Sequence, residues 1–229
     1  NKVVISIHQP NFVPWLGFFN KIHSSDIFIF LTECKRSKND KYLTRSLILN
    51  NYSKKYLSIP LGPKQKIIKT LELPPEKKWR VDMLNQLHAA YSESNYYEEI
   101  HNDFEKLIMF DCRYFYQFTI NIIYFFMKAL NIKKTCYIDL DFNKEFGESN
   151  NRLINLCNEV KASTYLSGVG AKSYIDEDIF LENKIEVVYQ KYLPPQYKQL
   201  SDEFIPGLSI IDALFNCGYS KTEIIVKNL

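Results

Sequence analysis

VVISIHQPNFVPWLGFF, at residues 3–19, joins a short β-branched run to a polar loop that contains two prolines. The apolar run predicts a strand, and His8, Gln9 and Asn11 follow at its carboxyl end. In open α/β sheets, ligands bind in the crevice outside this end of the strands. Each proline fixes one φ angle and restricts the residue before it, so we expect a stiff loop. The stretch therefore favours an α/β fold with a candidate site in this loop, although a packed and capped turn would use the same residues.

Length, charge and cysteine content narrow the class of protein. The 229 residues suffice for one large α/β domain with a core of its own. A net charge of +3, from 29 basic and 26 acidic residues, does not point to nucleic acid or a membrane surface as a partner. The 5 cysteines lack a C-x-x-C pair, which favours reduced thiols over a disulfide frame or a zinc site. No signal-peptide pattern and no apolar run of bilayer length occur, so we expect a soluble cytoplasmic protein.

Apolar periodicity divides the chain into two parts of one α/β core and a helical block. Beyond the first strand, strands are expected at residues 26–31, 42–49, 56–60, 71–73, 135–139, 164–167 and 185–189. Helices are expected at residues 17–23, 79–92, 96–110, 115–130, 148–160 and 176–183. We predict a Rossmann-like, mostly parallel sheet from residues 1–74 and 132–229, with a helical insertion at 75–131 and one structural unit overall. The apolar helix at 115–130 favours either burial or a homodimer interface.

A second stretch, SGVGAKSY at residues 167–174, follows a predicted strand. Glycine permits a close approach of the backbone, so successive N–H groups can face an anion, and Lys172 adds positive charge. The stretch lacks the spacings of a P-loop or a dinucleotide-binding loop. A tight turn between a strand and a helix, with one exposed lysine, is the alternative.

The third stretch, LSIIDALFNCG at residues 208–218, has the pattern of a capped helix. Ser209 is a natural N-cap, Asp212 would complete a capping arrangement, and Gly218 would end the helix. Free cysteine is usually buried, so Cys217 is a candidate nucleophile only if something lowers the pKa of its thiol.

Together these motifs resemble the WbqC-like family almost from end to end, most weakly across the helical block. The matching residues are HQPN at 8–11, PWLGF at 14–18, LSGVGAKSY at 166–174, YKQ at 197–199 and LSIIDALFNCG at 208–218. Members are associated with O-antigen and other surface-polysaccharide clusters, and some have been proposed to be glycine transferases. The resemblance implies modification of a sugar nucleotide, such as acylation of an amino sugar by an amino acid. The family usually has asparagine before the arginine that corresponds to Arg45, where this chain has Thr44.

N-acyl transfer needs a base and groups that hold both substrates. His8 is the candidate base, because imidazole titrates near neutral pH. Asp212 would orient His8 or bind the substrate amine, and Cys217 with His8 would give a covalent route. The other expected contacts are to substrate. Gln9, Asn11 and Asn216 would contact the acyl group or its oxyanion, and Arg45 and Lys172 would contact the diphosphate. Trp15 and Tyr174 would stack on a base or sugar face, and the remaining substrate contacts expected within the motifs are Ser167, Gly168, Gly170, Gln199 and Ser209.

The expected ligands are a dTDP- or UDP-linked amino sugar and an acyl donor. The donor is either an activated acyl compound or a carboxylate that ATP activates. Nucleic acid is expected only if aminoacyl-tRNA is the donor, and neither a metal ion nor a membrane is expected.

Two other functions fit the same residues. The first strand, its Pro-containing loop and the next helix are similar to the start of nucleotidylyltransferases and pantoate ligases, which would imply an ATP-dependent amide ligase. The paired histidines of those enzymes fall where this chain has Pro14, Trp15 and Gly17, so the phosphate-binding pair is missing. Lys172-Ser173 is loosely similar to their Lys-Ser signature. The other alternative is a non-catalytic sugar-nucleotide-binding protein of a glycan cluster.

Overall fold

A five-stranded parallel sheet forms the centre of the fold in the computed structural model, which describes residues 2–37, 40–62 and 66–228. Its strand order is β5-β2-β1-β6-β7, and all pairings within it are parallel. If these strands are renumbered along the chain, the order is 3-2-1-4-5, which is that of a Rossmann-type sheet. The predicted α/β class is confirmed.

The strands of this sheet begin and end close to the predicted positions. They are short runs rich in Val, Ile, Tyr and Phe, and the three central ones are buried along most of their length, as expected for strands that are covered on both faces. Their bounds are β1 (Val4–His8), β2 (Ile27–Phe30), β5 (Thr135–Ile138), β6 (Thr164–Ser167) and β7 (Glu186–Tyr189).

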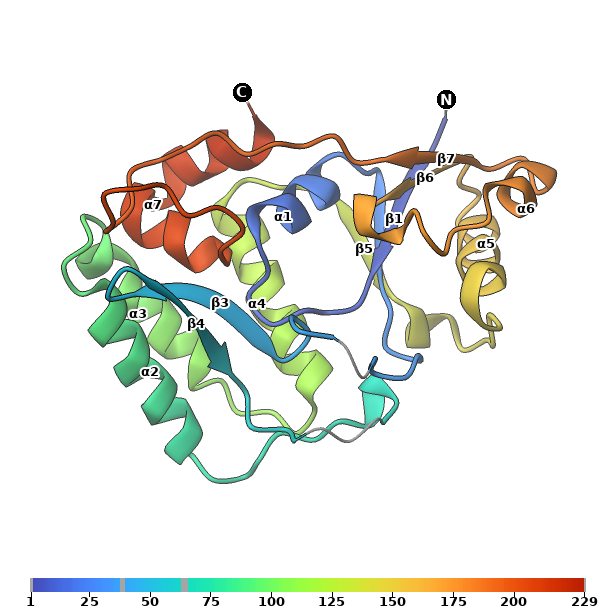
Figure 1. Ribbon diagram of the computed structural model, residues 1–229. Helices are drawn as coiled ribbons and strands as arrows, with labels where there is room; N and C mark the ends of the chain where they lie inside the picture. Colours follow the sequence, from blue (N-terminus) through green and yellow to red (C-terminus); the bar gives the residue numbers. More distant parts are fainter. Residues whose placement is uncertain (1, 38–39, 63–65, 229) are drawn as a thin grey trace.

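Helices cover both faces of the sheet and complete a three-layer structure (Figure 1). Their bounds are α1 (Leu16–His23), α2 (Lys78–Tyr91), α3 (Tyr97–Ile108), α4 (Phe115–Ala129), α5 (Ser149–Glu159), α6 (Glu177–Glu182) and α7 (Ile210–Lys227). Ile5, Ile7 and Ile29 share one core with α5 and α6. Phe28 and Phe30 share a second, larger core with α1, α4 and α7. Within the described residues, none of the helices has the length and apolar character needed to cross a membrane.

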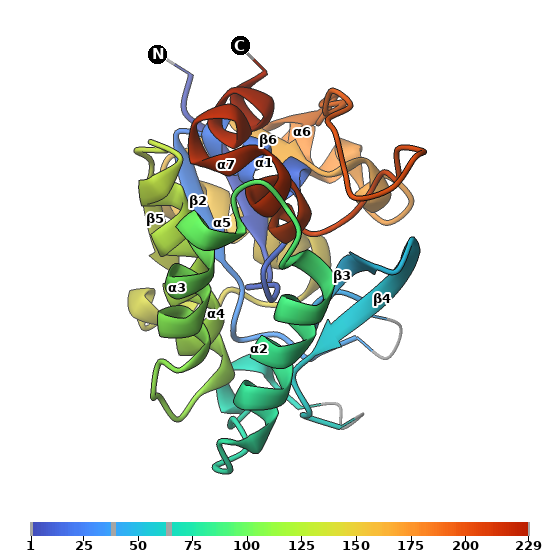
Figure 2. The ribbon, with the colours of Figure 1, turned by 90° about the vertical axis from the view of Figure 1, so that its left-hand side faces the viewer.

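An antiparallel hairpin of β3 (Arg45–Asn50) and β4 (Ser53–Ser58) lies beside α2, outside the main sheet (Figure 2). The two predicted strands of this region are therefore present, but they meet at a tighter turn than expected. Asn51 and Tyr52 form that turn with φ of 47° and 60°. Two successive positive φ angles match the twist of a hairpin.

The predicted strand at residues 71–73 is wrong. Glu72 makes only an isolated bridge, to Tyr114 at the start of α4, so this segment contacts α4 without forming a strand. The three predicted helices of residues 75–131 are present, and their apolar side chains belong to the same core as those of the sheet. The apolar side of α4 is buried within the chain itself. The insertion boundaries and the homodimer stay predictions.

Helix α7 begins and breaks where the sequence predicts. Oγ of Ser209 accepts the N–H of Ile211 at 3.2 Å, which makes Ser209 the N-cap. Gly218 interrupts the helix with φ 76° and ψ 176°, a region open almost only to glycine. A second helical segment, which we did not predict, continues to Lys227. The expected capping arrangement with Asp212 is wrong, because that carboxylate accepts its hydrogen bonds elsewhere.

The carboxylate of Asp139 joins the carboxyl ends of β2 and β5. It accepts the backbone N–H groups of Thr32, Glu33 and Leu140 at 2.9 Å, and also the hydroxyl of Thr32 at 2.6 Å. A buried carboxylate needs such partners to offset its lost hydration. The contacts fix the edge of the sheet at which the candidate site lies.

Gly218→Ala is expected to destabilise the fold. A Cβ at this position would lie 2.6 Å from Cδ1 of Tyr96, and its positive φ strains any L-residue. We expect the free energy of unfolding, measured by urea denaturation, to fall by at least about 2 kcal/mol. Gly170→Ala is the matched control, because nothing lies within 4 Å of its Cβ position, and it should change stability by less than about 0.5 kcal/mol. Equal stability of the two variants would contradict the role given to Gly218.

Candidate functional site

A cavity of about 780 Å³ opens at the carboxyl ends of the central strands. Ile7 and His8 of β1, Leu31 and Cys34 after β2, and Tyr165 of β6 contribute to its lining. The strand order reverses between β1 and β6, so the cavity lies at the topological switch point, where Rossmann-type sheets bind ligands. The position agrees with the site expected from the first loop.

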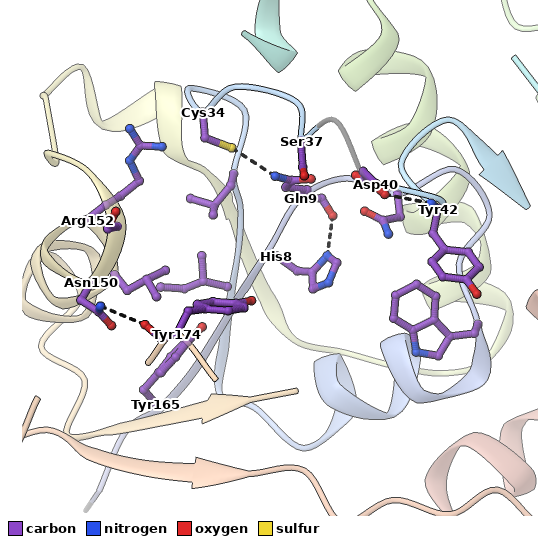
Figure 3. A pocket seen from close by; sticks show the side chains of 16 residues that line it. His8, Gln9, Cys34, Ser37, Asp40, Tyr42, Asn150, Arg152, Tyr165 and Tyr174 are labelled. Carbon is purple, nitrogen blue, oxygen red and sulfur yellow. Dashed lines mark hydrogen bonds between the residues drawn. The ribbon is translucent and has the colours of Figure 1, made fainter. Parts of the chain in front are cut away.

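The cavity has two chemically different ends (Figure 3). Arg152, in the first turn of α5, and Tyr174 lie at one end, and Asp40 and Tyr42 lie at the other, with His8 between them. One end is therefore positive, and the N-terminus of a helix adds to the attraction for an anion there. The opposite end carries a carboxylate.

His8 is held by its neighbours in an uncharged form. Its Nδ1 donates to the carbonyl oxygen of Gln9 at 2.9 Å, so Nε2 is the acceptor nitrogen. The rings of Phe18 and Trp15 contact the imidazole edge to face, with centroids 4.9 Å and 5.9 Å away. Burial, assisted by the charge of Lys21, lowers the pKa of His8 to about 3, although the bond to Gln9 acts in the opposite direction.

Lys21 is a buried cation on the α1 side of His8. Lys21 is 5% exposed, and its Nζ lies 6.0 Å from the ring centroid of Phe18. In the described part of the chain no carboxylate pairs with this ammonium, and burial lowers the pKa of Lys21 to about 8. A positive charge at this position opposes protonation of His8.

Asn11 brings an unsatisfied polar group to the cavity. The residue is 4% exposed and lines the cavity, and its Oδ1 has no hydrogen-bond partner among the residues that the structure describes. An unpaired buried amide oxygen costs about 1–3 kcal/mol, which a ligand N–H or O–H group would recover. Gln9 lies nearby with its Nε2 3.5 Å from Sγ of Cys34. Nε2 of His8 and Oδ1 of Asn11 therefore both favour a hydrogen-bond donor on the ligand.

Five of the predicted site residues line this one cavity, namely His8, Gln9, Asn11, Trp15 and Tyr174. Arg45 and Ser209 line a neighbouring cavity instead, which shares Trp15 with the first. At the position where the family usually has asparagine, Oγ1 of Thr44 accepts a hydrogen bond from Arg36 at 3.1 Å.

Apart from Tyr174, the glycine turn after β6 (residues 167–174) does not line either cavity. Ser167 is buried and donates to the carbonyl of Gly168 at 3.2 Å. Neither Gly168 nor Gly170 has a positive φ. Lys172 is exposed, and its Nζ lies 5.6 Å from the ring centroid of Tyr189. The tight-turn interpretation of this stretch therefore accounts for its geometry, and the diphosphate contact of Lys172 stays a prediction.

Asp212 lies at the centre of a buried hydrogen-bond network. Its Oδ1 accepts from the hydroxyl of Tyr91 at 3.0 Å and from Nδ2 of Asn216 at 3.3 Å. Its Oδ2 accepts from the hydroxyl of Tyr197 at 2.7 Å and from Nε2 of Gln199 at 2.9 Å. Burial raises the pKa of Asp212, and these donors counteract the rise. The network joins α7 to α2 and to the segment that precedes α7.

We had expected Asp212 either to orient His8 or to bind the substrate amine. In the structure its carboxylate is hydrogen-bonded within the buried network and not to His8. Gln199 and Asn216 also belong to the buried network and do not line the cavity. Cys217 is buried, and burial raises the pKa of its thiol to about 11, the opposite of what a nucleophilic cysteine needs. Among the described residues, no group of three His, Cys, Asp or Glu side chains is arranged to hold a metal ion.

Sequence reasoning missed Arg152, Asp40 and Tyr42. The signal for Arg152 was the predicted helix at 148–160, because helix N-termini that follow sheet strands bind anions. Asp40 and Tyr42 lie in the long connection after β2, where no local pattern indicates the direction of a side chain.

Comparison with known proteins gives a family and one relative. A family model described as the WbqC-like protein family matches residues 9–224. The chain is 30% identical over 233 residues to an uncharacterized protein of Mycobacterium tuberculosis (strain ATCC 25618 / H37Rv), Rv1507c, with 93% of this chain and 94% of the relative covered. No solved structure matches the chain.

His8→Gln is expected to flatten the acid side of the stability profile. The pKa of His8 is about 3 in the folded chain and 6.5 ordinarily, so between these values the unfolded chain binds a proton that the folded chain does not. Stability should fall as the pH drops through this interval, by up to about 1.4 kcal/mol per pH unit from this residue. Urea denaturation at about pH 7 and about pH 4 measures how steeply the free energy of unfolding changes with pH. Parallel profiles for the variant and the unmodified protein would refute the lowered pKa.

Asp212→Asn is expected to destabilise the fold. In either orientation the new amide would turn its NH₂ group toward the NH₂ group of Gln199 or Asn216, so one buried donor would lose its acceptor. We expect a loss of about 2–3 kcal/mol in the free energy of unfolding, measured by thermal and urea denaturation. Ligand binding in the cavity, measured below the melting temperature, should be retained. A stable variant that no longer binds would show that Asp212 belongs to the site.

Proposed function

Because the chain belongs to the WbqC-like family, we propose that it modifies a nucleotide-linked amino sugar in the biosynthesis of O-antigen or another surface glycan. The proposed reaction is N-acyl transfer, with a glycyl or other aminoacyl group as the acyl unit and the sugar amine as the acceptor. We place this step in the cytoplasm, where sugar nucleotides are available.

The observation that carries the proposal is the polarity of the 780 Å³ cavity. A dTDP- or UDP-amino sugar has an anionic diphosphate and, some distance away, an amine. Arg152 and the N-terminus of α5 suit the diphosphate, since arginine offers a fork of donors to phosphate oxygens. The acceptors of His8 and Asn11 suit the amine, and Tyr174 suits a ring face.

The proposed chemistry uses His8 as the proton acceptor. The amine nitrogen attacks the acyl carbonyl carbon, a C–N bond forms, and the bond to the leaving group of the donor breaks with its electron pair on that group. The amine proton passes to Nε2 of His8, which is unprotonated at neutral pH. The donor is an activated acyl compound such as a thioester, an acyl phosphate formed with ATP, or aminoacyl-tRNA. A bound diphosphate would raise the pKa of His8 and make it a stronger base.

One observation favours a second function. A histidine whose pKa is near 3 is a weak base, so the same cavity would serve a protein that binds a sugar nucleotide without transforming it. Such a protein needs Arg152 and Asn11 but gains nothing from His8 as a base. Stoichiometric binding without turnover is the signature of this alternative.

The experiment that tests the function is mass spectrometry of the purified protein incubated with dTDP- and UDP-amino sugars, glycine and ATP, with and without cell extract. A sugar nucleotide heavier by one glycyl unit is the expected product. Omission of ATP or extract separates an ATP-dependent ligase from a carrier-dependent transferase. A sugar nucleotide that co-elutes unchanged under every condition would replace the transferase by the binding protein.

Arg152→Gln is expected to weaken UDP binding about tenfold or more, because a charge-assisted bidentate contact is lost. Isothermal titration calorimetry with UDP measures the dissociation constant. Arg113→Gln removes the same charge from an exposed ion pair with Glu72 and is the matched control. An equal effect of both substitutions would assign the loss to net charge and remove Arg152 from the site.

A further inference from the structure

A second cavity of about 230 Å³ lies directly beside the first. Trp15 and Tyr42 line both cavities, and their rings contact each other edge to face with centroids 5.8 Å apart. This aromatic pair is therefore a wall between the two spaces. At about 30 Å³ for each water molecule in the liquid, the second cavity has the volume of about eight waters, which suits a ligand the size of a small amino acid.

Arg45 gives this cavity a positive group that is held in a fixed orientation. Its Nε donates to the carbonyl of Lys41 at 3.0 Å, and its guanidinium carbon lies 4.1 Å from the ring centroid of Tyr56. These two contacts hold the plane of the guanidinium. In the described part of the chain, the terminal nitrogens have no acceptor and form no ion pair. A planar fork of this kind matches the two oxygens of a carboxylate.

The remaining walls are apolar or already satisfied. Val13 and Leu47 contribute apolar surface. The hydroxyls of Ser46 and Ser209 donate to the carbonyls of Phe12 and Val13, each at 2.7 Å, so neither needs a ligand. A phosphate ion, with its larger charge, would need several donors, whereas a small carboxylate needs one guanidinium and an apolar surface for its short tail.

We propose that the second cavity is a binding site for a small organic carboxylate, which the fork of Arg45 holds by its two oxygens. The assignment of this carboxylate as the acyl unit rests on the proposed function, whereas the site itself does not. An acyl group on a carrier has no free carboxylate. Occupancy by a free acid would therefore favour activation by ATP over transfer from a thioester or tRNA.

The test is titration of the purified full chain with acetate, propionate and glycine, followed by tryptophan fluorescence. Trp15 lines the cavity and is one of 2 tryptophans, so the Trp79→Phe background isolates its signal. We expect a saturable change in emission with at least one of these carboxylates below about 10 mM, and a loss of affinity of about tenfold or more in Arg45→Gln. Leu47→Phe, which fills the cavity, should also abolish the change.

Arg113→Gln is the control for loss of one positive charge and should bind like the unmodified chain. Thermal unfolding of every variant shows whether the fold is retained, and if Leu47→Phe unfolds, Arg45→Gln decides alone. The proposal is overturned if no carboxylate gives a saturable change, if Arg45→Gln binds normally, or if inorganic phosphate binds and the carboxylates do not.

Failure here and failure of the proposed function have different signatures. Carboxylate binding without any acylated sugar nucleotide would leave the site standing and remove the reaction. An acylated product formed equally well by Arg45→Gln and the unmodified chain would leave the reaction standing and overturn the assignment of the bound carboxylate as its acyl unit.

Discussion

The backbone of Val13 is held at φ 31°, and both cavities depend on this strained residue. A positive φ is unfavourable for a β-branched side chain and costs about 1–3 kcal/mol, so the surroundings must enforce it. Three successive carbonyls of the loop accept hydrogen bonds: that of Phe12 from Ser46, that of Val13 from Ser209, and that of Pro14 from Ile210. The first comes from β3 and the other two from the start of α7. The loop after β1 is thereby fixed from two sides.

This constraint explains why distant parts of the chain meet at the candidate site. Ser209 and Val13 are 196 residues apart in sequence. Trp15 bridges to Ser209 and at the same time forms the wall between the cavities. The hairpin and α7 hold the loop in shape from outside the sheet, while β1 fixes the position of His8. The third motif of the sequence thus supports the first one structurally.

The sequence predicted what local patterns determine. Alternating and periodic apolar residues located the strands and most helices, and the polar residues after the first strand located the cavity. Long-range partners were not predictable in this way. Asp212 has the position of a capping residue, but its carboxylate is bound by Tyr91, which lies 121 residues earlier in the chain. Arg152 reaches the cavity only because α5 crosses the sheet toward β6, which no local pattern encodes.

The shared wall of Trp15 and Tyr42 has a thermodynamic consequence. If a ligand in one cavity shifts either ring, it changes the free energy of binding in the other, and linkage requires the same coupling in both directions. If a ligand in the small cavity raises the affinity of the large cavity for its own ligand, the two ligands bind cooperatively without any movement of the sheet. Order of addition would then affect the rate at which the ternary complex forms but not its stability.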